Sequence, residues 1–181
     1  MFYYMAKNSM KQIEEDENKI LQELANNSNK SINEIAKKCG FSRQKVWRMI
    51  KNLEKTHTIW GYTTIINKEK QGLKSYTVLV KRTNQPMDEA MVDKIIERQM
   101  GQIAEKIGVI IESSYYVHGD FDWLMYITAE STKEAKKFCE MLNVTYNGTI
   151  NDIKLLETLF TVQENGIENP DISKLKEFFV Q

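Results

Sequence analysis

Two short helix patterns joined by a tight turn constrain the fold of this chain more than any other feature. Residues 31–34 read Ser-Ile-Asn-Glu, the spacing of a capping box, in which a serine oxygen accepts a free backbone N–H and a glutamate reaches back. Gly40 follows, where a helix end needs a positive φ angle, and Ser42 is placed to cap a second helix through about Lys55. A further helix pattern over residues 13–26 completes a helix-turn-helix arrangement of three helices.

The helix that follows Ser42 has one apolar and one basic side. Val46, Ile50 and Leu53 recur at helical spacing and predict a single buried stripe. The residues between them are predicted to point outward: Arg43, Gln44, Lys45, Trp47, Arg48, Lys51 and Asn52.

The charges of the chain balance in total but not along its length. The 25 basic and 25 acidic residues give a net charge of zero. Residues 30–55 hold eight basic and two acidic residues, a net +6, whereas the chain from Gly61 onward holds 14 basic and 18 acidic residues, a net −4. This asymmetry suggests a polyanion-binding head on an acidic body, and the alternative is a solvated helix face that is rich in lysine.

The sequence pattern changes after Thr58. Residues 59–66 are β-branched and aromatic, which predicts an extended segment, and the polar residues 67–73 predict a turn or linker. Beyond them the patterns alternate as strand, helix, strand, strand, helix and strand, over residues 75–82, 87–106, 109–117, 121–129, 132–142 and 149–162. This β-α-β-β-α-β order predicts a ferredoxin-like domain with an antiparallel sheet.

The predicted fold class is therefore α+β, with an N-terminal winged-helix/helix-turn-helix domain followed by the ferredoxin-like domain. We expect the helix-turn-helix domain at residues 10–60, a strand linker at 61–73, the ferredoxin-like domain at 74–164 and a C-terminal tail helix at 165–181.

Several motifs in this order resemble the Lrp/AsnC, or feast/famine, transcription regulators, a prokaryotic family. The matching residues span about 13 to 162: Asp16…Ile20-Leu21…Leu24, Gly40-Phe41-Ser42, Leu53 followed by Ile59-Trp60-Gly61-Tyr62, and Gly119-Asp120-Phe121-Asp122. The chain departs from the family near Met49 and His57, where Arg and Gly are frequent, and at the apolar Leu155 and Leu156. The resemblance implies a transcription regulator that binds double-stranded DNA.

The chemistry of the basic helix fits this role, because the major groove accepts one α-helix whose N-terminal side chains reach base edges. Arg43 can donate two hydrogen bonds to guanine and Gln44 can pair with adenine, whereas Lys37 and Lys38 fit phosphate contacts. Trp47 has three alternatives, stacking on a sugar, touching a thymine methyl or packing against the first helix, and packing is slightly favoured. The candidate DNA-binding residues are Ser31, Lys37, Lys38, Ser42, Arg43, Gln44, Lys45, Trp47, Arg48, Lys51, Asn52 and Lys55.

The resemblance also implies that the second domain pairs subunits into a homodimer through its sheet, with further assembly to a tetramer or octamer. In the family, the turn at residues 118–122 lies at a contact between dimers and borders an amino-acid pocket. The candidate effector-binding residues are His118, Gly119, Asp120, Phe121 and Asp122, and the alternative is a plain hairpin turn.

No metal site or cofactor is expected, because His57 and His118 have no neighbours at ligand spacing. Cys39 and Cys139 are interpreted as small core residues. We expect no membrane partner and a cytoplasmic location, since no apolar run is long enough to span a bilayer. The alternative to a regulator is a siroheme decarboxylase-like enzyme on the same layout, with a pocket lined by Tyr115, Tyr116, His118 and Trp123.

Overall fold

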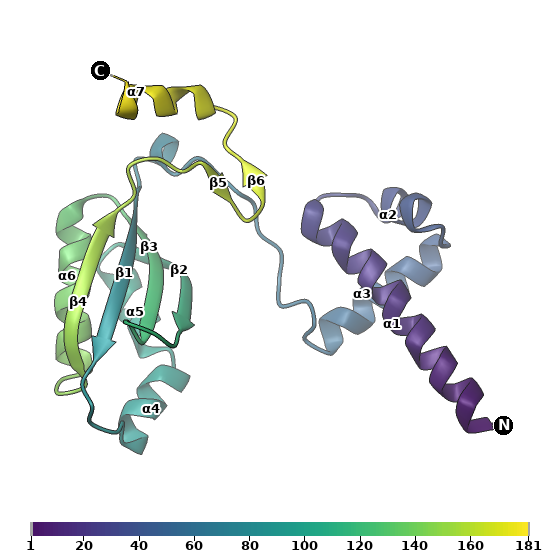
Figure 1. The fold of residues 1–181 in the computed structure, drawn as a ribbon, viewed down its shortest axis with the longest axis horizontal. Coiled ribbons are helices and arrows are strands. Elements are labelled where there is room, and N and C mark those ends of the chain that lie inside the picture. Colours follow the sequence, from purple (N-terminus) through teal and green to yellow (C-terminus); the bar gives the residue numbers. More distant parts are fainter. Residues whose placement is uncertain (1, 181) are drawn as a thin grey trace. The chain divides into compact units, whose positions relative to one another are not determined.

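A computed structural model describes residues 2–180, which form two compact units that divide between Ile65 and Ile66 (Figure 1). Each unit has a hydrophobic core of its own. The first unit is helical and the second holds a four-stranded antiparallel sheet with helices, so the predicted fold class is confirmed.

The first unit consists of α1 (Phe2–Asn26), α2 (Ile32–Cys39) and α3 (Arg43–Lys55). The prediction that the first helix starts near residue 13 is wrong, because no Gly or Pro interrupts the residues before it and the helix continues back to Phe2. Within the described residues no helix, α1 included, combines the length and hydrophobicity needed to cross a bilayer.

The caps that the sequence predicts are all formed. Ser31 Oγ accepts the backbone N–H of Glu34 at 3.3 Å, and Ser31 N donates to the Glu34 carboxylate at 2.8 Å. Gly40 ends α2 with a φ angle of +70°, and Ser42 Oγ accepts the backbone N–H of Lys45 at 3.2 Å. These caps fix the angle at which the chain turns from α2 into α3.

Residues 59–66 and the expected strand linker at 61–73 form no strand, which corrects the sequence prediction. An extended segment needs a neighbouring strand for its backbone hydrogen bonds, and the structure pairs these residues with none among those it describes. Instead, the N–H groups of Thr58 and Ile59 both donate to the carbonyl of Leu53 and close the end of α3. The one regular element within residues 61–73 is η1 (Glu69–Gln71).

The second unit has the β-α-β-β-α-β order that the sequence predicts. Its sheet has the strand order β2-β3-β1-β4, with every pair antiparallel. Figure 1 shows α5 and α6 on one face of this sheet. The strands are β1 (Lys74–Arg82), β2 (Val109–Tyr116), β3 (Trp123–Ala129) and β4 (Ile150–Glu157), and the helices are α4 (Glu89–Ile96), α5 (Gln99–Lys106) and α6 (Thr132–Thr145).

The single helix predicted over residues 87–106 is two helices in the structure. Arg98 takes a left-handed conformation with a φ angle of +56° and separates α4 from α5. The break lets Met100 and Ala104 reach the core while Ile96 stays exposed. No Gly or Pro marks the break, so the sequence carries no local signal for it.

Side chains on the strands alternate between a buried and an uncovered face. On β1, Tyr76, Val78 and Val80 are buried under the helices, whereas Thr77 and Leu79 lie on the opposite face. No helix among the described elements packs on this opposite face, which we call the outer face. The residues that the strand register places on it are Ser75, Thr77, Leu79, Lys81, Ile110, Ser113, Tyr115, Leu124, Tyr126, Thr128, Asp152, Lys154 and Leu156. Thr128 is the buried member of this set, and it donates a hydrogen bond to Glu112.

The C-terminal tail is not the single helix expected at residues 165–181. After β4 the chain forms a short hairpin of β5 (Gln163–Glu164) and β6 (Ile167–Glu168), which turns at Asn165 and Gly166 with positive φ angles. The helical part follows as η2 (Ile172–Leu175) and α7 (Lys176–Phe179). Gly166 suits the tight turn, because glycine adopts positive φ without steric cost.

Candidate nucleic-acid interface

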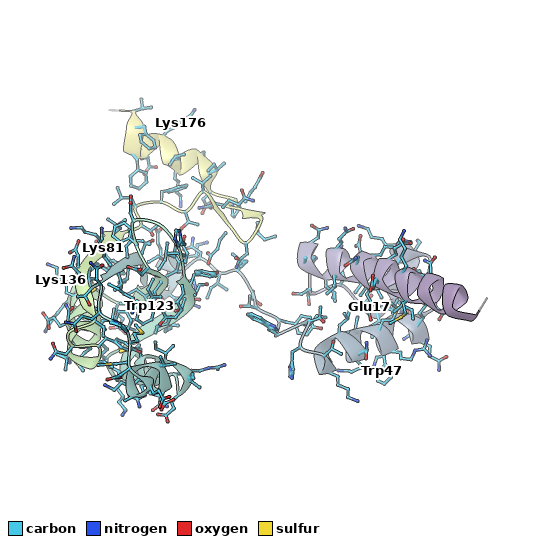
Figure 2. All side chains as sticks on the ribbon, turned by 60° about the horizontal axis from the view of Figure 1, so that its bottom comes forward. Glu17, Trp47, Lys81, Trp123, Lys136 and Lys176 are labelled. Atoms are coloured by element: carbon cyan, nitrogen blue, oxygen red, sulfur yellow. The ribbon has the colours of Figure 1, made fainter. Side chains whose placement is uncertain are left out.

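The third helix packs into the first unit with one side and exposes the other. Val46, Met49 and Leu53 are buried, so Met49 takes a place in the stripe that the sequence analysis assigned to the half-buried Ile50. Trp47 is 52% exposed, and Figure 2 shows it on the outer side of α3. About half of this large aromatic side chain is therefore available to a ligand, and the preference for packing against the first helix stays a prediction.

Lys45 does not lie free on the outer side, in contrast to the prediction. Its Nζ lies 2.5 Å from an Asp16 carboxylate oxygen, and it also lies 4.1 Å from the ring centre of Phe41. The hydrogen bond from Lys45 lowers the pKa of the Asp16 carboxyl, so the pair is charged at neutral pH. Lys45 therefore ties α3 to α1 and is not a free cation for a phosphate.

A second acid on α1 holds two further lysines. The Glu23 carboxylate lies 2.7 Å from Lys30 Nζ and 3.3 Å from Lys38 Nζ, and these contacts lower its pKa. The hydrogen bond to Glu23 raises the pKa of Lys30. Since Lys38 was predicted to hold a phosphate, the structure gives it a competing partner within the unit.

Two more candidates on α3 have acidic partners. Lys51 lies 2.7 Å from Glu54, and the Asn52 side-chain amide donates to Glu17 of α1 at 3.3 Å; Figure 2 labels Glu17. Such exposed pairs contribute little to stability, but each carboxylate competes with a phosphate for its partner. Asn52 and Lys51 stay accessible, with their side chains already oriented.

Five candidate side chains are exposed and have no hydrogen-bond or ion-pair partner in the part of the chain that the structure describes. Arg43, Gln44 and Arg48 lie on the first two turns of α3, Lys55 lies on its last turn, and Lys37 lies on α2. Because Arg43, Gln44 and Arg48 flank Trp47, the exposed start of α3 combines two guanidinium groups, an amide and an aromatic ring. This combination suits hydrogen bonding and apolar contact with base edges.

The two candidate serines, Ser31 and Ser42, cap the helices that follow them. The backbone N–H and the hydroxyl of Ser31 both bond the Glu34 carboxylate, and Ser42 Oγ accepts a backbone N–H of α3. The Ser31 hydroxyl bond and its backbone bond lower the pKa of Glu34. The start of α2 therefore already holds an anion, which disfavours the predicted DNA contact at Ser31.

The residues that sequence reasoning missed are the acids of α1 that arrange the basic surface. Asp16 and Glu23 are seven residues apart, with the buried Ile20 between them, so they share the face of α1 that meets the other helices. The spacing of these acids around Ile20 is the sequence signal that could have identified them.

The turn at residues 118–122 is ordered by β1. The N–H of Asp122 donates to the Val80 carbonyl at 3.0 Å, and the Asp122 carboxylate accepts the N–H of Arg82 at 2.8 Å. Gly119 has a φ angle of +153°. His118 and Asp120 are exposed, and Phe121 and Asp122 are half-buried.

One hollow of the second unit lies away from this turn, between α6 and β4. Its volume is about 430 Å³, and it is lined by Tyr76, Thr132, Lys136, Cys139, Glu140, Ile153, Leu155 and Glu157. None of the predicted effector residues lines it. Among the described residues, no group of three or more His, Cys, Asp or Glu side chains could hold a metal ion.

Both cysteines pack against a core, as the sequence analysis expected. Cys39 contacts the core of the first unit and Cys139 that of the second. Burial raises the pKa of both thiols, that of Cys139 to about 11, so neither is activated as a nucleophile.

Comparison with known proteins shows which proteins this helix-turn-helix arrangement is similar to. Residues 17–59 match the family model described as winged helix-turn-helix DNA-binding. Among curated proteins, the proline dehydrogenase transcriptional activator of Rhodobacter capsulatus is 26% identical over 125 residues, 69% of this chain and 77% of its own length. The HTH-type transcriptional regulator LrpA of Mycobacterium tuberculosis is 23% identical over 81% of this chain and 91% of its own length.

Solved structures share the whole two-domain fold. An AsnC family transcriptional regulator from Agrobacterium tumefaciens is 18% identical with a TM-score of 0.61, over 91% of this chain and 98% of that one. A transcriptional regulator of Neisseria meningitidis, solved as a complex with L-Met, is 16% identical with a TM-score of 0.62, over 82% of this chain and 91% of that one. The resemblance to Lrp/AsnC regulators is confirmed, and these relatives favour a regulator over the siroheme decarboxylase alternative.

Proposed function

We propose that this protein, whose fold and helix-turn-helix segment are those of the Lrp/AsnC transcription regulators, is itself a sequence-specific, DNA-binding transcription regulator. The observation that carries the proposal is the exposed start of α3, where Arg43, Gln44 and Arg48 surround Trp47 and have no partner within the described chain. The acids of α1 hold the neighbouring lysines and leave this group free.

In this proposal the start of α3 enters the major groove of double-stranded DNA. Arg43 donates to guanine O6 and N7, Gln44 pairs with an adenine edge, and Trp47 contacts a thymine methyl group or a sugar. Lys37 on α2 and Lys55 at the end of α3 bind phosphates, which position the head without reading sequence. One such head makes few contacts, so specific binding requires two heads on a two-fold operator.

A homodimer supplies the second head. The outer face of the sheet carries Ile110, Tyr115, Tyr126 and Leu156 as exposed apolar side chains. An exposed patch of this kind on a two-layer domain is typical of a subunit contact. Two outer faces packed against each other would form the dimer of a cytoplasmic regulator, and such dimers can assemble further into tetramers or octamers.

The proposal also includes regulation by a bound amino-acid effector. A structural relative was solved with L-Met, and the turn at 118–122 offers an ordered Asp122 and an exposed Asp120, which can accept bonds from an ammonium group.

The test is a binding titration against genomic fragments, including the region upstream of its own gene, at several salt concentrations. Each of Arg43→Ala and Gln44→Ala should lower the preference for the selected site over random DNA by about 1–3 kcal/mol. Lys137→Ala, an exposed lysine on α6, is the matched control and should leave binding unchanged. Salt-insensitive binding, or no binding to any fragment, would overturn the proposal.

A further inference from the structure

The C-terminal tail, residues 158–180, exposes an unusual concentration of large apolar side chains. They range from 44% to 80% exposed and comprise Leu159, Val162, Ile167, Ile172, Phe178, Phe179 and Val180. Single exposed apolar residues are normal on a protein surface, but seven of them within one short segment indicate a contact surface.

The tail is nevertheless folded, which sets it apart from a disordered extension. Asn169 bridges its two halves, because its backbone N–H donates to the Val162 carbonyl at 3.0 Å and its side-chain amide to the Thr161 carbonyl at 2.7 Å. The rings of Phe160 and Phe178 lie 5.7 Å apart. An ordered segment that leaves its apolar side chains in water lacks the burial that normally offsets the entropy lost on ordering.

The first residues of the tail follow directly on the outer face of the sheet. Leu156 is the last residue of β4 that the register places on that face, and the N–H of Thr158 donates to the Ser75 carbonyl at the start of β1. The apolar residues of the tail therefore follow directly on the surface through which the proposed dimer forms.

The outer face alone is rather polar for a stable dimer interface. Seven of the thirteen residues that the register places on it are polar or charged, namely Ser75, Thr77, Lys81, Ser113, Thr128, Asp152 and Lys154. Lys154 and Asp152 form an ion pair at 2.9 Å. Charged residues are depleted at the cores of interfaces, so additional apolar surface would strengthen the contact.

We propose that the tail is an arm that binds a second copy of this chain and enlarges the contact between the two outer faces. The inference rests on the proposed function, because it presumes the dimer that brings two heads to one operator. The arm supplies apolar area in addition to that of the sheet, so the stability of the dimer depends largely on residues after position 162, where the resemblance to the Lrp/AsnC family ends.

The direct test compares two double variants by sedimentation equilibrium of the full-length protein. Val162→Ser with Phe179→Ser removes apolar area from the arm, and the side chains of both residues are exposed and make no hydrogen bond. The matched control, Ile96→Ser with Val144→Ser, removes similar area from exposed sites on α4 and α6. We expect the arm variant to raise the dimer Kd at least tenfold and the control to change it less than twofold.

An unchanged dimer Kd in the arm variant would overturn the inference, as would a monomeric wild-type protein. Hydrogen exchange provides the second readout, because amides of residues 158–180 should become more protected as protein concentration rises through the dimer Kd. Protection that is independent of concentration would mean that the arm docks on its own subunit, and it too would overturn the inference. DNA binding is measured separately, so loss of salt-dependent binding alone would count only against the proposed function.

Discussion

The salt dependence of DNA binding can be worked out from the ion pairs of the first unit. Eight basic residues lie between residues 30 and 55, and four of them are paired with acids of the same unit, namely Lys30, Lys38, Lys45 and Lys51. Four remain free in each head to neutralise phosphates. Each neutralised phosphate contributes about −0.9 to the slope of log K against log salt concentration.

A dimer with eight free cations should therefore show a slope no steeper than about −7, or a loss of about 10⁴ in affinity between 50 and 200 mM salt. If the ion pairs opened and every basic residue bound a phosphate, the slope would approach about −14. Fluorescence anisotropy of a labelled operator fragment, titrated at five or more salt concentrations, separates these two values.

A pair of single variants tests the same reasoning within one protein. Lys37→Ala removes a free cation from each head and should make the dimer slope shallower by about 1.8. Lys30→Ala removes a lysine that is already paired, and Glu23 keeps Lys38 as its partner, so the slope should stay the same. Equal changes in both variants, or a wild-type slope near −14, would refute the idea that acids of the first unit withhold half of the basic charge.

Three further predictions concern stability and reactivity. Ser31→Ala removes the capping box of α2 and should lower the free energy of unfolding by about 1 kcal/mol in urea denaturation, whereas Ser31→Thr should retain most of it. The hydrogen bond from Lys45 lowers the pKa of Asp16. The stabilisation from Asp16 is therefore present above about pH 4 and is lost as the pH falls through the lowered pKa. Asp16→Asn should remove this acid dependence from the midpoint of urea denaturation. Burial raises the pKa of Cys139 to about 11, so iodoacetamide at pH 8.5 should alkylate it on the order of a hundredfold more slowly than it does in urea.

Each of these has a result that would contradict it. A Ser31→Ala protein as stable as wild type would mean that the capping bonds contribute nothing net. Parallel stability curves for wild type and Asp16→Asn from pH 2 to 7 would show that the pair with Lys45 does not stabilise the folded state. Equal alkylation rates in native and denatured protein would place Cys139 at the surface.

Local sequence patterns predicted the structure correctly where it depends on residues that are close together in the chain. The capping box at Ser31, the left-handed Gly40 and the cap at Ser42 follow from spacings of a few residues, and the structure forms all three. The order of strands and helices in the second unit also followed from periodicity, because alternation and helical spacing are properties of consecutive residues.

Prediction was weaker where a structure depends on distant partners. Residues 59–66 have strand composition but no strand beside them, and the helix expected over 87–106 breaks at Arg98 to bring Met100 and Ala104 to the core. The local sequence pattern predicts neither outcome, because each depends on which elements the rest of the fold packs beside the segment.

By itself the sequence determined that this chain contains a basic, capped helix-turn-helix and a β-α-β-β-α-β domain, because local spacing dictates caps, turns and amphipathic faces. Only the tertiary structure decided which cations on the basic surface are free. Lys45 and its partner Asp16 are 29 residues apart, and Lys38 and Glu23 are 15 apart, so packing of α1 against its neighbours selects the partners. Charge composition is a property of the chain, whereas the charge available to DNA depends on which side chains the fold brings within bonding distance.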